Sequence, residues 1–252
     1  MIGSDPELFL KNADGKYISA IGIVGGNKNY PKPVKELGKG FFVQEDNVLL
    51  EFNTPPARSS NKWVDNHSVM LTHLNKTLEA KGLKIAIDAS AEMPVDQLQD
   101  PRAHVFGCDP DFNVWTLKPN PRPHSDNPNL RSAGGHVHVA YKGTNVNKIL
   151  LGRKLDLFLG LWSVISDPDT RRRELYGKAG AIRFKPYGIE YRTLSNFWLA
   201  TPDLTYMVWE GVERALKYGR DVPDNVPQFI NSGDKAYAEE TYRTLTGRRG
   251  WF

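Results

Sequence analysis

The sequence predicts an α+β fold built on a largely antiparallel sheet. Segments of β-strand character come in pairs separated by turn-rich stretches, and helical patterns fall between these pairs. No repeat or low-complexity tract interrupts this order. With 252 residues, of which 40% are apolar, the chain is large enough to bury an ordinary globular core. We therefore expect a single domain over residues 1–252.

The N-terminal part alternates strand and turn before its first helix. Residues 6–10, 17–24 and 41–53 have strand character, and turn-rich sequences such as NADGK and GGNKNYPKP separate them. Apolar residues then recur at helical spacing over residues 61–80. Residues 83–90 return to a strand pattern, so this helix is expected to cover one face of the sheet.

A long polar segment divides the chain. Residues 100–131 are rich in Pro, Asn and Asp, and such a segment inside a compact domain is more often a functional loop than a linker. The sequence beyond it predicts one strand, a buried helix, a hairpin and two further helices. These are SAGGHVHVAY, residues 146–166, AIRFKPYGIEYRTL, residues 203–219 and residues 234–246.

Composition excludes several classes of protein. A net charge of +4 and a pI near 9.0 are only mildly basic, so charge alone does not indicate a nucleic-acid partner. The single cysteine, Cys108, excludes an internal disulfide, and no base nearby in the sequence would activate it as a nucleophile. No apolar run approaches the roughly 20 residues of a membrane span, and the N-terminus lacks a signal-peptide pattern. We therefore expect a cytoplasmic protein.

Carboxylates on the first strands are the first candidate functional residues. Residues two apart on a strand share a face, so Asp5 and Glu7 in GSDPELFL are expected to project together. The same spacing groups Glu45 with Glu51 in QEDNVLLEFNTPP. Glu51 lies between two apolar residues, and an unpaired buried carboxylate is costly, so it faces water or a cation.

Two later strands add imidazoles and a charged pair. His136 and His138 share a face after two glycines, and Glu190 shares a face with Arg192. Several carboxylates with histidine fit Mg²⁺ or Mn²⁺ on a polyphosphate better than structural zinc. Phosphoryl transfer also requires cations near the transferred group. A cluster of such side chains falls in one short region, namely Arg173, Lys178, Arg183, Lys185 and Arg192.

Each motif also has an ordinary structural interpretation. The Asp5 and Glu7 pair is compatible with a solvated strand start, and the two histidines with a cross-strand surface pair. Glu190 and Arg192 are compatible with a simple salt bridge. The run 171–173 reads as a helix end with at least two solvated arginines. Asp109 and Asp111 either cap a turn or orient a substrate amine, and the turn is favoured.

The order of these motifs resembles the carboxylate-amine ligase superfamily of glutamine synthetase and gamma-glutamylcysteine ligase. The chain is most similar to the short phage-encoded COOH-NH2 ligases, or amidoligases. The resemblance extends over nearly the whole chain, from GSDPELFL through EDNVLLEFNTPPA and SAGGHVHVAY to RRRELYGKAGAIRFKPYGIEYRTLSNFW. It implies a curved antiparallel sheet flanked by helices, as in the glutamine synthetase catalytic domain, and a location in the host cytoplasm.

The resemblance also implies roles for individual residues. The predicted metal ligands are Asp5, Glu7, Glu45, Glu51, His136 and Glu190. Arg192, Arg183 and Glu51 are the predicted catalytic residues, and His138 and Arg183 are predicted to bind the cofactor. The cationic region, rather than the resemblance, adds Arg173, Lys178 and Lys185 to the predicted cofactor-binding residues. Asp5 stands where the larger ligases have Glu, and the additional N-terminal domain of glutamine synthetase is missing from the sequence.

The implied activity is ATP-dependent amide formation. ATP would phosphorylate a substrate carboxylate, and an amine would then attack the acyl phosphate, with Mg²⁺ or Mn²⁺ as cofactor and residues 100–131 as a candidate lid. Neither the acid nor the amine is identified by the sequence, and an oligomer is possible. Two alternatives stay open: a metal-dependent hydrolase or nuclease, and a non-catalytic binding module with acidic strands on a wet sheet face.

Overall fold

The computed structural model describes residues 1–104, 111–121 and 125–246, and Cys108 and Asp109 lie outside these ranges. All strand pairings among the described residues are antiparallel, which confirms the predicted α+β class. Two larger sheets and one small ribbon organise the chain. None of the described helices is long and apolar enough to cross a membrane.

The first sheet combines the N-terminus with the C-terminal half of the chain. Its strand order is β1-β12-β14-β13-β9-β10. The strands are β1 (Ile2–Ser4), β9 (Phe112–Asn113), β10 (Lys118–Pro119), β12 (Val137–Ala140), β13 (Ala181–Lys185) and β14 (Gly188–Tyr191). The predicted hairpin of AIRFKPYGIEYRTL forms β13 and β14, and SAGGHVHVAY supplies β12, as expected.

The second sheet contains the N-terminal strands. Its order is β3-β2-β6-β5-β4, with β7 paired to β2, while β8 and β11 form a separate ribbon. The strands are β2 (Glu7–Asn12), β3 (Tyr17–Ile18), β4 (Lys32–Pro33), β5 (Phe42–Asp46), β6 (Leu49–Asn53), β7 (Leu83–Ala86), β8 (Ser90–Glu92) and β11 (Leu130–Ser132). The predicted strand 17–24 is shorter than expected, since only its first two residues pair, and 41–53 is a hairpin.

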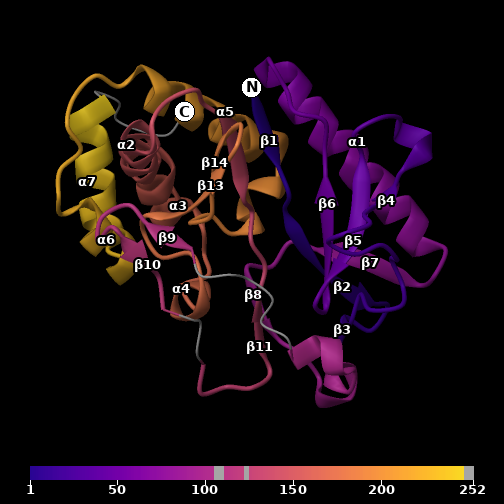
Figure 1. Ribbon diagram of the computed structural model, residues 1–252. Helices are drawn as coiled ribbons and strands as arrows, with labels where there is room; N and C mark the ends of the chain where they lie inside the picture. Colours follow the sequence, from indigo (N-terminus) through magenta and orange to yellow (C-terminus); the bar gives the residue numbers. More distant parts are fainter. Residues whose placement is uncertain (105–110, 122–124, 247–252) are drawn as a thin grey trace.

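Helices pack around both sheets (Figure 1). The expected helix 61–80 is α1 (Ser60–Glu79), which begins at a Ser59 cap, and it lies beside the second sheet. The remaining helices gather around the first sheet; they are α2 (Asn145–Leu155), α3 (Leu161–Ser166), α4 (Arg172–Leu175), α5 (Pro202–Lys217), α6 (Val226–Ser232) and α7 (Lys235–Thr246). Short 3-10 segments cover Lys35–Leu37, Val95–Leu98, Pro101–His104 and Asn196–Leu199.

The predicted helix 146–166 is interrupted in its middle. A π-helical turn, Asp156–Gly160, separates α2 from α3 and brings the buried Asp156 carboxylate to Tyr191 on the sheet. A continuous apolar core links the layers, since one cluster of buried residues extends from Ile2 to Tyr242. α1 and α5 contact each other across it, and Trp63 of α1 stacks on Trp198 at a centroid distance of 5.6 Å.

Candidate active site

The chain passes from the first sheet to the second between β1 and β2, and the site lies at this crossing. β1 pairs with β12 of the first sheet, whereas Glu7 at the start of β2 pairs with Glu51 of the second sheet. Asp5 lies between the two strands. The two carboxylates therefore do not share one strand face, as their spacing predicted, but point to two separate clusters.

The first cluster contains only carboxylates. Glu7, Asp46 and Glu51 bring oxygen atoms within 4.8 Å of one another, from β2, β5 and β6. Burial and then the neighbouring Asp5, Asp46 and Glu7 raise the pKa of Glu51 well above its usual value. Burial and the Glu7 charge likewise raise the pKa of Asp46 to about 6. Like charges held together in a partly dry site are stabilised by a bound cation.

Glu45, which the sequence predicted as a ligand, lies outside this cluster, and Asp46 is present in its place. Glu45 Oε1 accepts hydrogen bonds from the backbone N–H groups of Gly22 and Gly25, and Oε2 lies 3.3 Å from Arg102 Nη1. Glu45 is excluded from the cluster by the register of the β5-β6 hairpin, in which Gln44 pairs with Glu51 across the two strands. This register puts even-numbered residues of β5 on the face of Glu51, so Asp46 joins the cluster and Glu45 points away.

The second cluster combines carboxylates with histidine. Asp5, His136 and Glu190 bring ligand atoms within 4.8 Å of one another. Asp5 Oδ1 lies 3.5 Å from His136 Nδ1 and 2.9 Å from His138 Nε2, so the two histidines reach the same carboxylate. Burial alone would raise the pKa of Asp5, but both histidines outweigh it and hold that pKa well below its usual range. Asp5 in turn raises the pKa of His138 against the effect of burial.

Glu190 is surrounded by cations from β13 and from the end of β14. Its Oε2 lies 2.7 Å from Lys185 Nζ, and its Oε1 lies 3.2 Å from Arg183 Nη1 and also contacts Arg192 Nη1. Burial alone would raise the pKa of Glu190, but Arg192 reverses this and the pKa falls to about 2. The structure thus brings together three of the predicted cationic residues.

The other two predicted cationic residues lie elsewhere. Arg173 donates to Ser163 Oγ of α3, at 2.8 Å, and Lys178 is exposed. In the run 171–173, predicted as a helix end with at least two solvated arginines, Arg171 is exposed, Arg173 is half-buried and the central Arg172 is only 3% exposed. Its guanidinium donates to the backbone carbonyls of Ala133 and Thr193 and so fixes the two segments that carry His136 and Arg192.

The glycines before the histidines permit close packing. A Cβ on Gly134 would lie 2.3 Å from His136 Nε2, and one on Gly135 would lie 2.1 Å from the Ser195 carbonyl oxygen. The backbone N–H of Gly134 also donates to Glu7 Oε2 at 2.6 Å. The glycine pair therefore connects the two clusters through the backbone.

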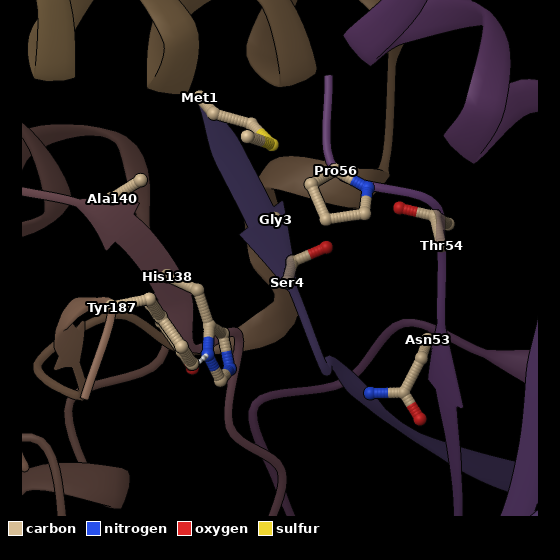
Figure 2. Close-up of a pocket in the computed structure, with 9 residues that line it drawn as sticks. All are labelled: Met1, Gly3, Ser4, Asn53, Thr54, Pro56, His138, Ala140 and Tyr187. Carbon is tan, nitrogen blue, oxygen red and sulfur yellow. Dashed lines mark hydrogen bonds between the residues drawn. The ribbon is translucent and has the colours of Figure 1, made fainter. Parts of the chain in front are cut away.

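A pocket opens beside His138 between β1, the end of β6 and the β13-β14 turn (Figure 2). Its volume is about 440 Å³, and its lining is mostly apolar. His138 Nδ1 is hydrogen-bonded to the Tyr187 hydroxyl on one side, and Asn53, Thr54 and Pro56 lie opposite. Thr54 Oγ1 is buried and has no hydrogen-bond partner within the described part of the chain.

A comparison with family models agrees with the predicted family. Residues 128–239 match the family model described as phage phiEco32-like COOH.NH2 ligase-type 2. The matched segment is less than half of the chain and includes His136, Arg183, Glu190 and Arg192. The match confirms the resemblance to this family over residues 128–239. Curated protein sequences give no match to the chain.

Solved structures give distant similarities. One described as "GmaS/ADP complex-Conformation 1" is 12% identical at a TM-score of 0.44, and "Apo GmaS without ligand" is 14% identical at the same score. Each alignment covers 99% of this chain and 70% of the other. A "novel glutamine synthase homolog" is 12% identical at a TM-score of 0.36, over 99% of this chain and 68% of the other.

Proposed function

We propose that the protein is an ATP-dependent carboxylate-amine ligase that forms an amide through an acyl phosphate. The observation that carries this proposal is the adjacency of two carboxylate clusters to a group of three cationic side chains. Clusters of oxygen ligands suit divalent cations, and arginines beside them suit the phosphoryl group that these cations accompany. The ligase-family match to the segment carrying Glu190 and Arg192 supports the same reaction class.

The donor atoms of both clusters fit Mg²⁺ or Mn²⁺. Glu7, Asp46 and Glu51 would hold one ion through oxygen alone, and their mutual repulsion favours a cation at that position. Asp5, His136 and Glu190 would hold a second ion through two carboxylates and one imidazole. When bound, such ions neutralise phosphate charge and polarise the transferred group.

The pocket beside His138 suits the base and ribose of the nucleotide. Its volume of about 440 Å³ falls within the range of small-molecule sites, and Met1 and Pro56 give it apolar walls. The buried Thr54 hydroxyl, directed toward Pro56, and the Asn53 amide offer polar contacts to a ligand (Figure 2). Because His138 also contacts Asp5, the pocket adjoins the second cluster, where the phosphates would lie.

The cationic residues would then act on the transferred phosphoryl group. Arg183 and Arg192 lie next to Glu190 and would stabilise negative charge on the phosphoryl oxygens, and Lys185 would add a third positive charge. Burial of Arg192 excludes water around it and strengthens this effect. A carboxylate substrate and an amine substrate would meet at this position. Cytoplasmic location and phage origin stay predictions.

The test measures ADP release by the purified protein with ATP, Mg²⁺ and pooled amino acids. We expect release that requires Mg²⁺ and increases with the amine, and we expect Asp46→Asn to lower it by at least about 100-fold. Glu45→Gln is the matched control, since the neighbouring carboxylate faces away from the cluster, and its activity should stay within about twofold of wild type.

Other outcomes separate the alternatives. ATP-independent hydrolysis of a phosphoester would favour a metal-dependent hydrolase or nuclease. Absence of turnover, together with no change in melting temperature on adding Mg²⁺ and ATP, would favour a non-catalytic binding module. Either result would refute the ligase proposal.

A further inference from the structure

Arg183 and Arg192 are bridged by carboxylates on two sides. On one side, Glu190 Oε1 contacts Nη1 of both arginines. On the other side, Asp111 Oδ1 lies 2.7 Å from Arg192 Nε and 3.9 Å from Arg183 Nη2. The four groups form a closed arrangement of alternating charge in which one oxygen of Asp111 faces both guanidinium groups.

Asp111 differs from Glu190 because it belongs to neither carboxylate cluster. It precedes β9, which lies between β13 and the edge strand β10 of the first sheet, and its backbone carbonyl accepts a hydrogen bond from the N–H of Asn120. The residue is 9% exposed, so its charge is withdrawn from water and compensated by the two arginines. A turn-capping role, which the sequence favoured for Asp111, does not require this contact.

A cation in the second cluster would change the balance of this arrangement. Glu190 would share its charge with the cation, and its hold on Arg183 and Arg192 would weaken. The arginines, which Asp111 alone would then neutralise, would have more charge available for an incoming oxyanion than in the metal-free protein. The Glu190 bridge would stay next to the metal, so the position available to that oxyanion is the one Asp111 fills.

We propose that Arg183 and Arg192 form an oxyanion site for a phosphoryl or carboxylate group, and that Asp111 closes this site as an internal competing carboxylate. Binding of the ligand requires the Asp111 side chain to leave the arginines, because two carboxylate-type anions at one position repel each other. The inference deepens the proposed function, on which the phosphoryl identity of the ligand rests.

The closure has a consequence for the reaction. Each oxyanion that binds must displace the Asp111 carboxylate from its ion pairs with the two arginines, so the affinity of the oxyanion for the ligand-free protein is low. The released Asp111 carboxylate would stay within reach of the site, since it is attached to β9, which pairs with β13 at Ile182 beside Arg183. The site therefore opens to an anion that displaces Asp111 and closes again when the anion leaves.

The test titrates inorganic phosphate into protein freed of metal by a chelator and measures the dissociation constant by calorimetry. We expect Asp111→Asn to bind phosphate at least about tenfold more tightly than wild type, because the competing charge is gone and the shape is kept. Asp14→Asn, an exposed carboxylate in the β2-β3 turn, is the matched control for a change of one charge and should leave the constant unchanged.

A double variant assigns the effect to the arginines. Adding Arg183→Gln to Asp111→Asn should remove most of the gain in phosphate affinity. Melting curves check that each variant folds, and Asp111→Ser serves in place of Asp111→Asn if the latter does not fold. Unchanged or weaker phosphate binding in a folded Asp111 variant would overturn the proposal.

The failure of this proposal is distinct from failure of the proposed function. The phosphate titration uses neither ATP nor metal, whereas the ligase test follows ADP release. A protein without ADP release whose Asp111 variants bind phosphate more tightly would retain the closed oxyanion site and lose the ligase assignment. ADP release by the protein, together with unchanged phosphate binding in its Asp111 variants, would retain the ligase assignment and refute the closed oxyanion site.

Discussion

The two carboxylate clusters lie on neighbouring sheets but have opposite electrostatic surroundings. Glu7, Asp46 and Glu51 repel one another, and burial with this repulsion raises the pKa of Glu51. Glu190 in the other cluster is 0% exposed yet carries a lowered pKa, because Arg192 and other cations compensate its charge. Glu190 is the more buried residue, since Glu51 and Asp46 are half-buried, so the neighbouring charges decide the direction of each pKa shift.

This difference separates the roles of the two sheets. The all-carboxylate cluster is incomplete without an external cation, whereas the Glu190 cluster supplies its own cations from β13 and the end of β14. A ligand that brings both a metal cation and phosphate groups would supply the cation to the first cluster and negative charge to the cations beside Glu190. Replacing one glutamate in each cluster by glutamine should therefore have opposite effects on the stability of the metal-free protein.

The largest effect is expected at Glu190. Glu190→Gln removes the carboxylate that contacts the buried Arg192 and the neighbouring Arg183 and Lys185, and leaves Asp111 as the counter-charge of the two arginines. Breaking a buried ion pair in this way costs about 3 to 5 kcal/mol, so the free energy of unfolding should fall by that order. Urea denaturation of the metal-free protein measures it. An unchanged midpoint would mean that these cations find other partners and would remove the contrast between the clusters.

A third buried carboxylate, that of Asp156, tests how burial alone changes a pKa when the hydrogen-bond donors around the carboxylate are neutral. Its neighbours are neutral donors, since Trp115 Nε1 lies 2.6 Å and the Tyr191 hydroxyl 2.7 Å from its oxygens, and burial raises its pKa to about 7. The unfolded state ionises near pH 4, so between about pH 4 and 7 the folded state binds more protons. The free energy of unfolding should fall by roughly 3 to 4 kcal/mol as pH rises through this window.

Asp156→Asn isolates that contribution. The difference between the pH-stability curves of wild type and variant removes the contribution of other groups such as Glu190, whose lowered pKa acts at lower pH. Denaturation midpoints measured from pH 4 to 8 should converge at the acidic end and diverge toward pH 7, with the variant more stable there. Parallel curves would contradict a raised pKa at Asp156.

Much of the fold was predictable from local pattern. Helix α1 follows the spacing of its apolar residues and starts at Ser59, and the β13-β14 hairpin follows a Pro-Tyr-Gly turn. The π-helical turn at Asp156 was not predictable, because an apolar sequence with one aspartate does not reveal that its carboxylate binds Tyr191. Such a contact depends on tertiary packing between α2 and the sheet.

The site was predictable in its residue types and less so in its grouping. The sequence singled out Glu7, Glu51, His136 and Glu190, and the structure brings them to one sheet junction. Asp46 was missed because the alternation of strand faces was extended from Glu45 to Glu51 as if they lay on one continuous strand. The chain in fact reverses at the β5-β6 turn, where Asn47 adopts a positive φ of 55°. An Asn in a tight turn is a signal that could have corrected the register.

The contacts of Asp111 and Arg172 could not be predicted from local sequence signals of this kind. Asp111 lies in a polar stretch whose composition favours a turn, and only the pairing of β9 with β13 brings it near Arg183. Arg172 stands in a run of three arginines, and its burial depends on the carbonyls of Ala133 and Thr193. Long-range contacts of this kind leave no mark on local sequence.

The smallest expected effect, and the one that completes the contrast, is at Glu51. Glu51→Gln removes one of the three repelling carboxylates while retaining the side-chain shape, so the metal-free protein should gain about 1 kcal/mol in the free energy of unfolding. Mg²⁺ should raise the melting temperature of wild type more than that of the variant, because the first cluster of the variant keeps only the carboxylates of Glu7 and Asp46 while the second cluster is unchanged. Paired melting curves with and without Mg²⁺ give both quantities. A variant that is less stable without metal would show that Glu51 is held by a favourable contact such as that with Gln44, and the first cluster would then be structural.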